Sequence, residues 1–221
     1  MLEFGTILGT LARENIRNYK VLWGAECSQK CQKVRFYKDS QGYKKMIKVL
    51  FICWGNICRS PMAEFILKDM VRRRGIEDQF LIESAATSME EIGNPVYPPA
   101  RRKLAEHGIR CDGHHAHKME RTDYQKFDYL IGMEELNIRY ILRITGGDPE
   151  GKIFKMLDFT DHPGEIDDPW YTGDFTTVFR QIYEGCEAFL VALSREGKLY
   201  WNGKPFKERK PHREGKTSGK R

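Results

Sequence analysis

The stretch from Ile47 to Leu67 constrains the fold of this chain more than any other. It begins with a nearly continuous apolar run, IKVLFIC, the pattern of a β-strand that is covered on both faces. A short loop follows at residues 54–59, and then Ser60-Pro61 and an apolar stripe predict a helix, with Ser60 as its cap. A doubly covered strand that leads into a helix is typical of a parallel sheet with helices on both sides.

The alternation of strand and helix continues along the chain. Because parallel strands need crossover connections, the pattern predicts an α/β fold in three layers, a four-stranded parallel sheet with helices on both faces. Ligands bind such sheets beyond the carboxyl ends of the strands, where the loop after the first strand lies. The further strands are expected at Phe80–Ser84, Phe127–Met133 and Lys152–Leu157, the further helices at Pro99–His107, Glu134–Ile144 and Phe175–Leu193, and a long polar loop at Asp158–Asp174.

Charge is distributed unevenly along the 221 residues. The net charge is +5 over residues 1–45, −6 over residues 46–194 and +7 over residues 195–221, which together make the overall +6. The body is thus mildly acidic and the ends are basic. We expect one domain at 46–194, with a natural start at Met46, which stands immediately before the first strand. We expect residues 1–45 to be a poorly ordered or non-native extension, and 195–221 to be a basic tail in which Tyr200, Trp201 and Phe206 could add a short strand.

Several classes of protein are disfavoured by composition. No run of 18 apolar residues is present, so no transmembrane helix or membrane partner is expected. The first residues lack the basic start of a signal peptide, and the six cysteines are too few for a disulfide scaffold, which favours reduced thiols and a cytoplasmic location. The acidic body gives no reason to expect nucleic-acid binding. A monomer is favoured.

The loop Cys53-Trp54-Gly55-Asn56-Ile57-Cys58-Arg59-Ser60 has the properties of a phosphate cradle with a built-in nucleophile. A loop that enters a helix N-terminus directs backbone N–H groups and the positive end of the helix dipole at one point, and Gly55 lets the backbone turn tightly. The same field favours a thiolate at Cys53. The planar guanidinium of Arg59 can hold two phosphate oxygens. Ser60 can donate to the Cys53 sulfur, and Asn56 can hold the loop through side-chain to backbone bonds.

The pattern C-x-G-N-x-C-R-S-P at the end of an apolar strand resembles that of the low-molecular-weight protein tyrosine phosphatases, and the likeness extends from Met46 to about Leu193. A second mark of this family, an Asp-Pro-aromatic-Tyr loop before the last helix, is matched by Asp168-Pro169-Trp170-Tyr171. The resemblance implies hydrolysis of phosphotyrosine in protein substrates through a phosphocysteine, without metal or cofactor. It implies Cys53 as nucleophile, Arg59 as phosphate clamp, Ser60 as hydrogen-bond donor to the thiolate, Asp168 as general acid and His114 as a partner that orders the loop.

The chemistry also calls for an acid, because a tyrosinate, whose conjugate acid has a pKa of about 10, leaves slowly unless it is protonated. Asp167 is a rival to Asp168, but Pro169 follows Asp168 as in the family pattern.

The chain departs from the family pattern at several positions. Trp54 replaces the usual leucine or threonine; it would enlarge the apolar wall beside the substrate ring, or else serve only for packing. Glu90 stands where many members have an aromatic residue at the pocket rim, and Trp170 with Tyr171 could compensate. Ala85 and Glu134 also depart from the family pattern, and both changes leave the catalytic assignment intact.

The predicted substrate-binding set comprises Trp54, Gly55, Asn56, Ile57, Cys58, Ser60, Trp170 and Tyr171. Within it, Ile57 favours phosphotyrosine, since related phosphoarginine phosphatases carry threonine there. Cys58 could trap an oxidised Cys53 as a disulfide.

Alternatives remain open at this stage. Arsenate reductases share the fold, but they need resolving cysteines that residues 127–144 lack. A non-catalytic phosphopeptide-binding module and an interaction protein that acts through its basic tails are the other two. The spacings make a four-thiolate zinc site at Cys27, Cys31, Cys53 and Cys58 conceivable, but the second pair lies in a loop that suits an anion, and Arg59 would lie against the metal. The cluster of His114, His115 and His117 lacks the helical i,i+4 spacing of ligands together with a carboxylate, which disfavours a metal there. Cys111 and Cys186 are expected to be packing residues.

Overall fold

The computed structural model describes residues 46–201 and 204–205. Four strands form one all-parallel sheet in the order β2-β1-β3-β4, and β5 pairs with β6 in a separate antiparallel pair. The elements are β1 (Ile47–Cys53), α1 (Arg59–Arg73), η2 (Glu77–Gln79), β2 (Phe80–Ala86), α2 (Pro98–Glu106), α3 (Asp123–Lys126), β3 (Tyr129–Gly132), α4 (Glu135–Thr145), β4 (Ile153–Lys155), η3 (Met156–Phe159), α5 (Pro169–Thr172), α6 (Phe175–Arg195), β5 (Tyr200–Trp201) and β6 (Lys204–Pro205).

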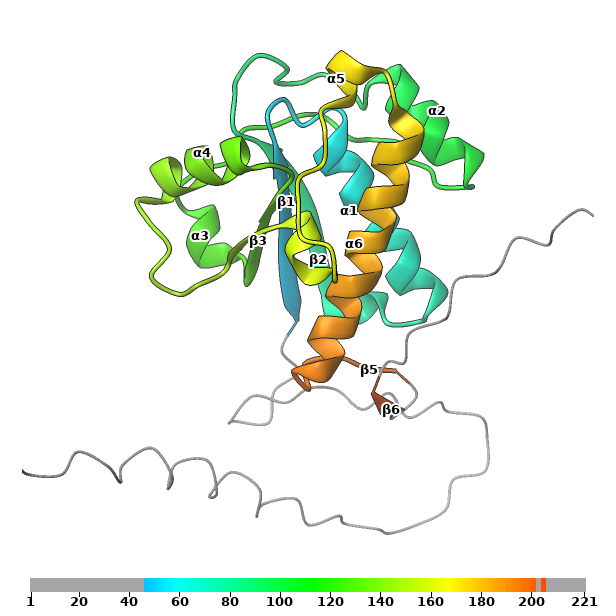
Figure 1. Cartoon of the computed structure of the whole chain (residues 1–221), viewed down its shortest axis with the longest axis vertical. Coiled ribbons are helices and arrows are strands. Elements are labelled where there is room, and N and C mark those ends of the chain that lie inside the picture. Colours follow the sequence, from blue (N-terminus) through cyan, green and yellow to red (C-terminus); the bar gives the residue numbers. More distant parts are fainter. Residues whose placement is uncertain (1–45, 202–203, 206–221) are drawn as a thin grey trace, which may run out of the picture. The chain divides into compact units, whose positions relative to one another are not determined.

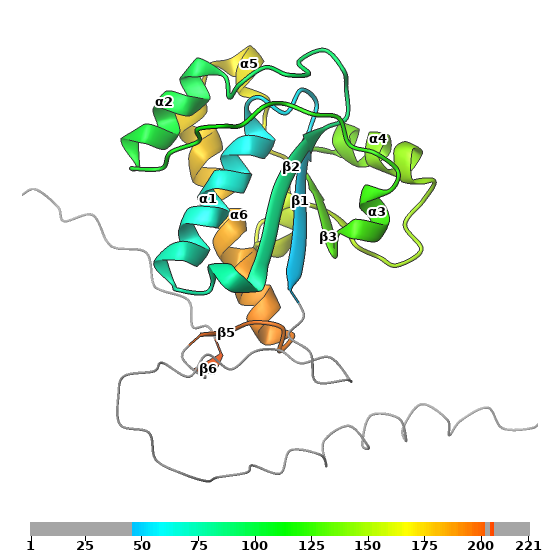
Figure 2. The same cartoon turned by 180° about the vertical axis from the view of Figure 1, so that it is seen from behind.

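Helices cover both faces of the sheet, as the sequence predicted. Figures 1 and 2 show α1, α2 and α6 on one side and α3 and α4 on the other. Each side has its own core, because alternate residues of a strand point to opposite faces. Val49 and Phe51 of β1 contribute to the larger core with α1 and α6, while Leu50 and Ile52 contribute to the smaller one with α4. The predicted three-layer fold with its four parallel strands is confirmed.

Several predicted boundaries were wrong. The third strand is shorter than Phe127–Met133, because Asp123–Lys126 forms the unforeseen helix α3 just before it. The fourth strand ends at Lys155, and the chain then turns into η3, where the Lys155 backbone N–H donates to Asp158 Oδ2 at 2.8 Å. The loop at Asp158–Asp174 contains α5, which Asp168 caps and Pro169 opens.

The chain remains packed beyond α6, since Leu199 is fully buried. The short strand suggested for Tyr200 and Trp201 exists, but it pairs with Lys204–Pro205 and not with the main sheet. Phe206 and residues 1–45 lie outside the described part of the chain. Within that part, no helix combines the length and the hydropathy needed to cross a membrane.

Candidate active site

The loop between β1 and α1 is held in shape by Asn56. This residue has φ 58°, a left-handed conformation that asparagine tolerates better than most residues. Its buried side chain donates from Nδ2 to the hydroxyls of Ser60 and Ser84, each at 2.9 Å, and accepts from the His117 backbone N–H at 3.2 Å. The predicted role of Asn56 thus extends beyond backbone bonds, because it ties the loop to α1 and β2 as well.

The Cys53 sulfur lies at the end of β1 beside two hydrogen-bond donors. Ser60 Oγ is 3.1 Å from the sulfur, and the backbone N–H of Asn56 donates to it at 3.3 Å. Both groups stabilise a thiolate more than a thiol. The prediction that Ser60 caps the helix was wrong, because α1 begins at Arg59 and the Ser60 hydroxyl points to the sulfur instead.

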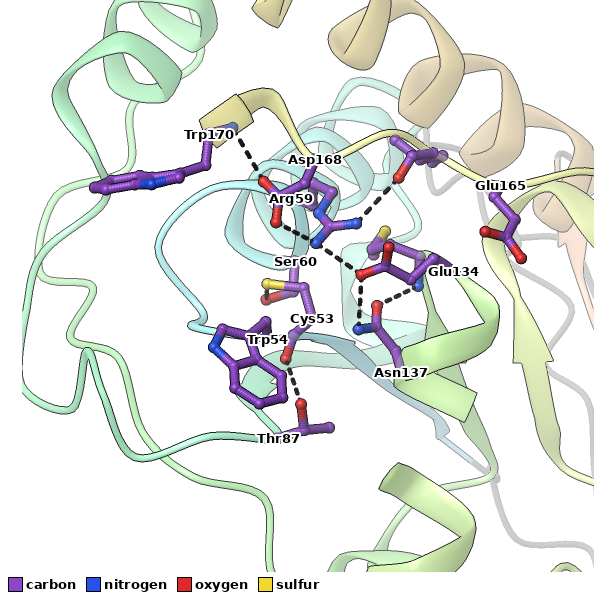
Figure 3. Close-up of polar contacts among 12 residues, drawn as sticks. Cys53, Trp54, Arg59, Ser60, Thr87, Glu134, Asn137, Glu165, Asp168 and Trp170 are labelled. Carbon is purple, nitrogen blue, oxygen red and sulfur yellow. Dashed lines mark hydrogen bonds and ion pairs between the residues drawn. The ribbon is translucent and has the colours of Figure 1, made fainter. Parts of the chain in front are cut away.

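Arg59 is almost fully buried at the first turn of α1 and binds three acceptors. Its Nη1 donates to the Ile166 carbonyl at 3.0 Å, and its Nη2 contacts Asp168 Oδ2 at 2.6 Å and Glu134 Oε1 at 2.9 Å. Figure 3 shows the guanidinium between the two carboxylates. Burial by itself lowers the pKa of Arg59, but the charges of Cys53, Asp168 and Glu134 outweigh it and the net pKa is raised. The cation is therefore permanent.

Asp168 reaches the site from the start of α5. One oxygen accepts from the Trp170 backbone N–H at 3.1 Å, which caps that short helix, and the other binds Arg59. Its side chain lines the same pocket as the Cys53 thiol. The rival Asp167 is exposed and does not line the pocket. The geometry therefore favours Asp168 over Asp167 as the candidate acid.

A cavity of about 170 Å³ lies over this loop. Trp54 forms one wall and packs edge-on against Tyr140 with ring centroids 5.2 Å apart, while Trp170 packs against Tyr97 at 5.0 Å. Asn56 and Ser60 do not reach the cavity surface and lie beneath it. The other predicted site residues of the loop and of α5 line it: Cys53, Trp54, Gly55, Ile57, Cys58, Arg59, Asp168, Trp170 and Tyr171.

Three site residues had no role assigned from the sequence, and they are Glu64, Glu91 and Glu134. Glu134, noted only as a departure from the family pattern, pairs with Arg59, and Glu91 lines the cavity together with Glu90, which was placed at the pocket rim. Glu64 accepts a hydrogen bond from Ser84, behind the loop. For Glu134 the available signal was its departure from the family pattern. For Glu64 no signal distinguished it from any other glutamate of an amphipathic helix.

His114 contacts the loop from outside the sheet. Its Nε2 lies 2.8 Å from the Asn56 carbonyl oxygen and acts as the donor, since a carbonyl can only accept. Burial lowers the pKa of His114, although the Asn56 carbonyl and Glu64 act in the opposite direction. A neutral imidazole with its proton on Nε2 satisfies this contact. His114 is thus positioned to fix the loop backbone at Asn56.

The remaining cysteines differ from Cys53 in their environment. Cys58 lines the cavity, and burial followed by the neighbouring Cys53 charge raises the pKa of its thiol, so it remains protonated. Cys111 and Cys186 are buried among apolar residues, as expected for packing residues. Within residues 46–201, no three His, Cys, Asp or Glu side chains cluster as metal ligands. Cys27 and Cys31 lie outside the described residues.

The site geometry can be compared with known proteins. The model of the family described as "Low molecular weight phosphotyrosine protein phosphatase" matches residues 48–199. The chain belongs to this family. It is 37% identical over 156 residues to the low molecular weight protein-tyrosine-phosphatase YfkJ of Bacillus subtilis. The aligned region covers 70% of this chain and 100% of YfkJ. The identity with the low molecular weight phosphotyrosine protein phosphatase of Gallus gallus is 40% over 148 residues, or 64% of this chain and 92% of that one.

Solved structures agree with these relationships. The crystal structure of YfkJ superposes with a TM-score of 0.67 and covers 70% of this chain and 99% of that one. A Drosophila arginine phosphatase superposes with a TM-score of 0.59 at 29% identity, over 65% of this chain and 96% of that one.

Proposed function

We propose that this family member hydrolyses phosphotyrosine in protein substrates through a phosphocysteine, with Cys53 as nucleophile, Arg59 as phosphate clamp and Asp168 as general acid and base. The observation that carries the proposal is the convergence of these three side chains on one cavity of about 170 Å³. In the first step the Cys53 thiolate attacks phosphorus, and the S–P bond forms as the P–O bond to tyrosine breaks. Asp168 gives its proton to the departing phenolate oxygen.

Water completes the cycle. Its oxygen attacks phosphorus while the Asp168 carboxylate takes its proton, and the P–S bond breaks to release inorganic phosphate and the thiolate. Ser60 Oγ and the Asn56 N–H, at 3.1 Å and 3.3 Å from the sulfur, stabilise the negative charge that returns to Cys53. This set of donors supports cysteine as both nucleophile and leaving group.

Arg59 couples substrate binding to the acid. The Nη2 atom of Arg59 contacts two carboxylates, Asp168 Oδ2 at 2.6 Å and Glu134 Oε1 at 2.9 Å. A phosphate that engages Nη2 must therefore displace one of them, and Asp168 is the partner that also lines the cavity. In the proposed mechanism Asp168 leaves Arg59, takes up a proton from solvent as it loses the neighbouring cation, and then faces the substrate oxygen as proton donor.

The walls of the cavity support an aromatic substrate. Trp54 and Trp170 offer flat apolar surfaces next to the thiol, which suits a phenyl ring that carries the phosphate. The similar Drosophila protein is named an arginine phosphatase, but Ile57 lines this cavity with an apolar side chain and favours a phenyl ring over a guanidinium. We place the reaction in the cytoplasm, where the thiolate nucleophile stays reduced.

Hydrolysis of phosphotyrosine peptides and of para-nitrophenyl phosphate tests the proposal. Cys53→Ser should lower kcat by more than a thousandfold on both, since a serine hydroxyl at this position lacks a general base. Asp168→Asn should lower kcat strongly for phosphotyrosine, about a hundredfold, and less for para-nitrophenyl phosphate, whose leaving group needs little protonation. Asp167→Asn is the matched control and should retain the wild-type rate. A Cys53→Ser variant as active as the wild type would refute the mechanism.

A further inference from the structure

The mouth of the cavity carries two carboxylates that the proposed reaction does not use. Glu90 and Glu91 line the cavity, and the only cation among its lining residues is Arg59. Arg59 is buried at the base, where it is already paired with two acids. The outer part of the site is therefore negative, although the phosphate that enters it is also negative.

Glu90 is held in a defined position. Its Oε2 accepts a hydrogen bond from the Trp54 indole at 2.8 Å, and Trp54 packs in turn against Tyr140. The Trp54 ring and the Glu90 carboxylate thus form one continuous wall of the cavity. The indole is the part that would face the substrate ring, and the carboxylate lies at the entrance. Within residues 46–201 the structure gives the Glu90 carboxylate this partner and no cation.

Glu91 lies over the turn of the loop. Its Cγ is 3.0 Å from the position that a Cβ on Gly55 would take, so the absent side chain at Gly55 allows this approach. Its carboxylate accepts from Asn94 Nδ2 at 2.7 Å, a neutral partner that leaves the charge in place. Two uncompensated negative charges therefore flank the entrance on the Trp54 side.

We propose that this acidic mouth selects phosphotyrosine that has lysine or arginine next to it in the substrate sequence. The inference rests on the proposed phosphatase function and concerns its substrate class. The buried Arg59 attracts the phosphate itself, whereas the rim meets the neighbouring side chains of the substrate. A cation there pairs with Glu90 and Glu91, and an acidic neighbour is repelled, so the rim discriminates by both attraction and repulsion.

Three phosphotyrosine peptides, identical except for lysine, alanine or glutamate on both sides of the phosphotyrosine, test this selection. At low ionic strength kcat/KM should rise from the glutamate to the lysine peptide by about tenfold, as several solvent-exposed ion pairs would produce. The change should reside in KM, since the rim does not touch the reacting atoms. Salt at about 0.5 M should reduce the ratio by screening.

Variants locate the source of the preference. In Glu90→Gln the amide oxygen can still accept from Trp54, so the wall is kept and only the charge is lost. The lysine-to-glutamate ratio should fall about threefold in Glu90→Gln and approach one in the double variant with Glu91→Gln. Glu77→Gln removes one exposed charge from η2, before the amino end of β2 and thus at the opposite end of the sheet, and should keep the wild-type ratio.

The outcomes separate the two proposals. Equal kcat/KM for the three peptides, or an unchanged ratio in the double variant, would overturn the selection while leaving the phosphatase function intact. Failure of the wild-type protein to hydrolyse any of the peptides would overturn the proposed function and the selection together.

Discussion

Arg59 shows how much of the site depends on single residues far apart in the chain. It is a buried cation with two carboxylate partners, Asp168 and Glu134. A buried charge is tolerated only when its partners satisfy it. In the proposed mechanism Asp168 leaves Arg59 for the substrate, which requires another anion to hold the guanidinium, and Glu134 is the residue in that position. Glu134 also accepts from Asn137 at 3.1 Å, which fixes the carboxylate at the start of α4.

Glu134 is therefore expected to position Arg59. In Glu134→Gln the amide oxygen still accepts hydrogen bonds but the charge is gone, and kcat/KM for phosphotyrosine should fall about fivefold, the equivalent of roughly 1 kcal/mol. Glu134→Asp keeps the charge on a shorter arm and should restore most of the activity. Glu135→Gln, on the neighbouring exposed residue, is the control. Equal activity of the Gln and wild-type proteins would show that Asp168 alone holds Arg59.

At the scale of elements, the loop between β1 and α1 is stabilised from behind by the segment that carries His114. The imidazole donates to the Asn56 carbonyl, and burial lowers its pKa below the ordinary value of about 6.5. Between that value and the lower pKa of the folded state, the unfolded chain binds more protons than the folded one. The stability that neutral His114 contributes is therefore present above about pH 6.5 and decreases as the pH falls through this interval.

Thermal unfolding between about pH 5 and pH 7.5 tests this linkage. The wild-type Tm should decrease toward acid more steeply than that of His114→Gln, whose side-chain N–H can still donate to the Asn56 carbonyl but does not titrate. His162→Gln, at an exposed loop histidine, should keep the wild-type slope. Parallel pH profiles for the wild type and His114→Gln would contradict the assignment.

For the whole molecule, the long helix α6 depends on a close approach to η3. Gly185 of α6 faces Met156, and a Cβ at this glycine would lie 2.8 Å from Met156 side-chain atoms and 3.0 Å from its carbonyl oxygen. The apolar stripe predicted the buried face of α6, but nothing local in the sequence indicated that a glycine was needed there for contact.

Gly185→Ala should destabilise the domain. Alanine gains about 1 kcal/mol over glycine in a helix, but the overlap with backbone and side chain of Met156 costs about 1–3 kcal/mol. We expect a net loss of about 1 kcal/mol in the free energy of unfolding, measured by urea denaturation. Gly164→Ala, where the nearest atom to the new Cβ is 3.9 Å away, should change it by less than about 0.5 kcal/mol. A Gly185→Ala variant more stable than the wild type would mean that α6 shifts without cost.

The sequence by itself determined the features that are local. The strand at Ile47–Cys53, the loop and the helix after it are adjacent in the chain, and their apolar pattern, glycine, asparagine and proline specify them directly. The alternation of strands and helices can also be read locally along the chain, and it correctly predicted the parallel sheet. The candidate acid Asp168 was identified by its short motif, and the structure brings it within 2.6 Å of Arg59.

Only the tertiary structure decided which distant side chains meet. The Glu134 contact with Arg59, the Glu90 contact with Trp54 and the packing of Gly185 on Met156 all join segments that are far apart in sequence. Such contacts depend on strand order, helix orientation and side-chain reach, which no local pattern encodes. The physical reason is that a residue's own neighbours determine its backbone conformation, whereas its partners in charge and packing are set by how the whole chain closes around them.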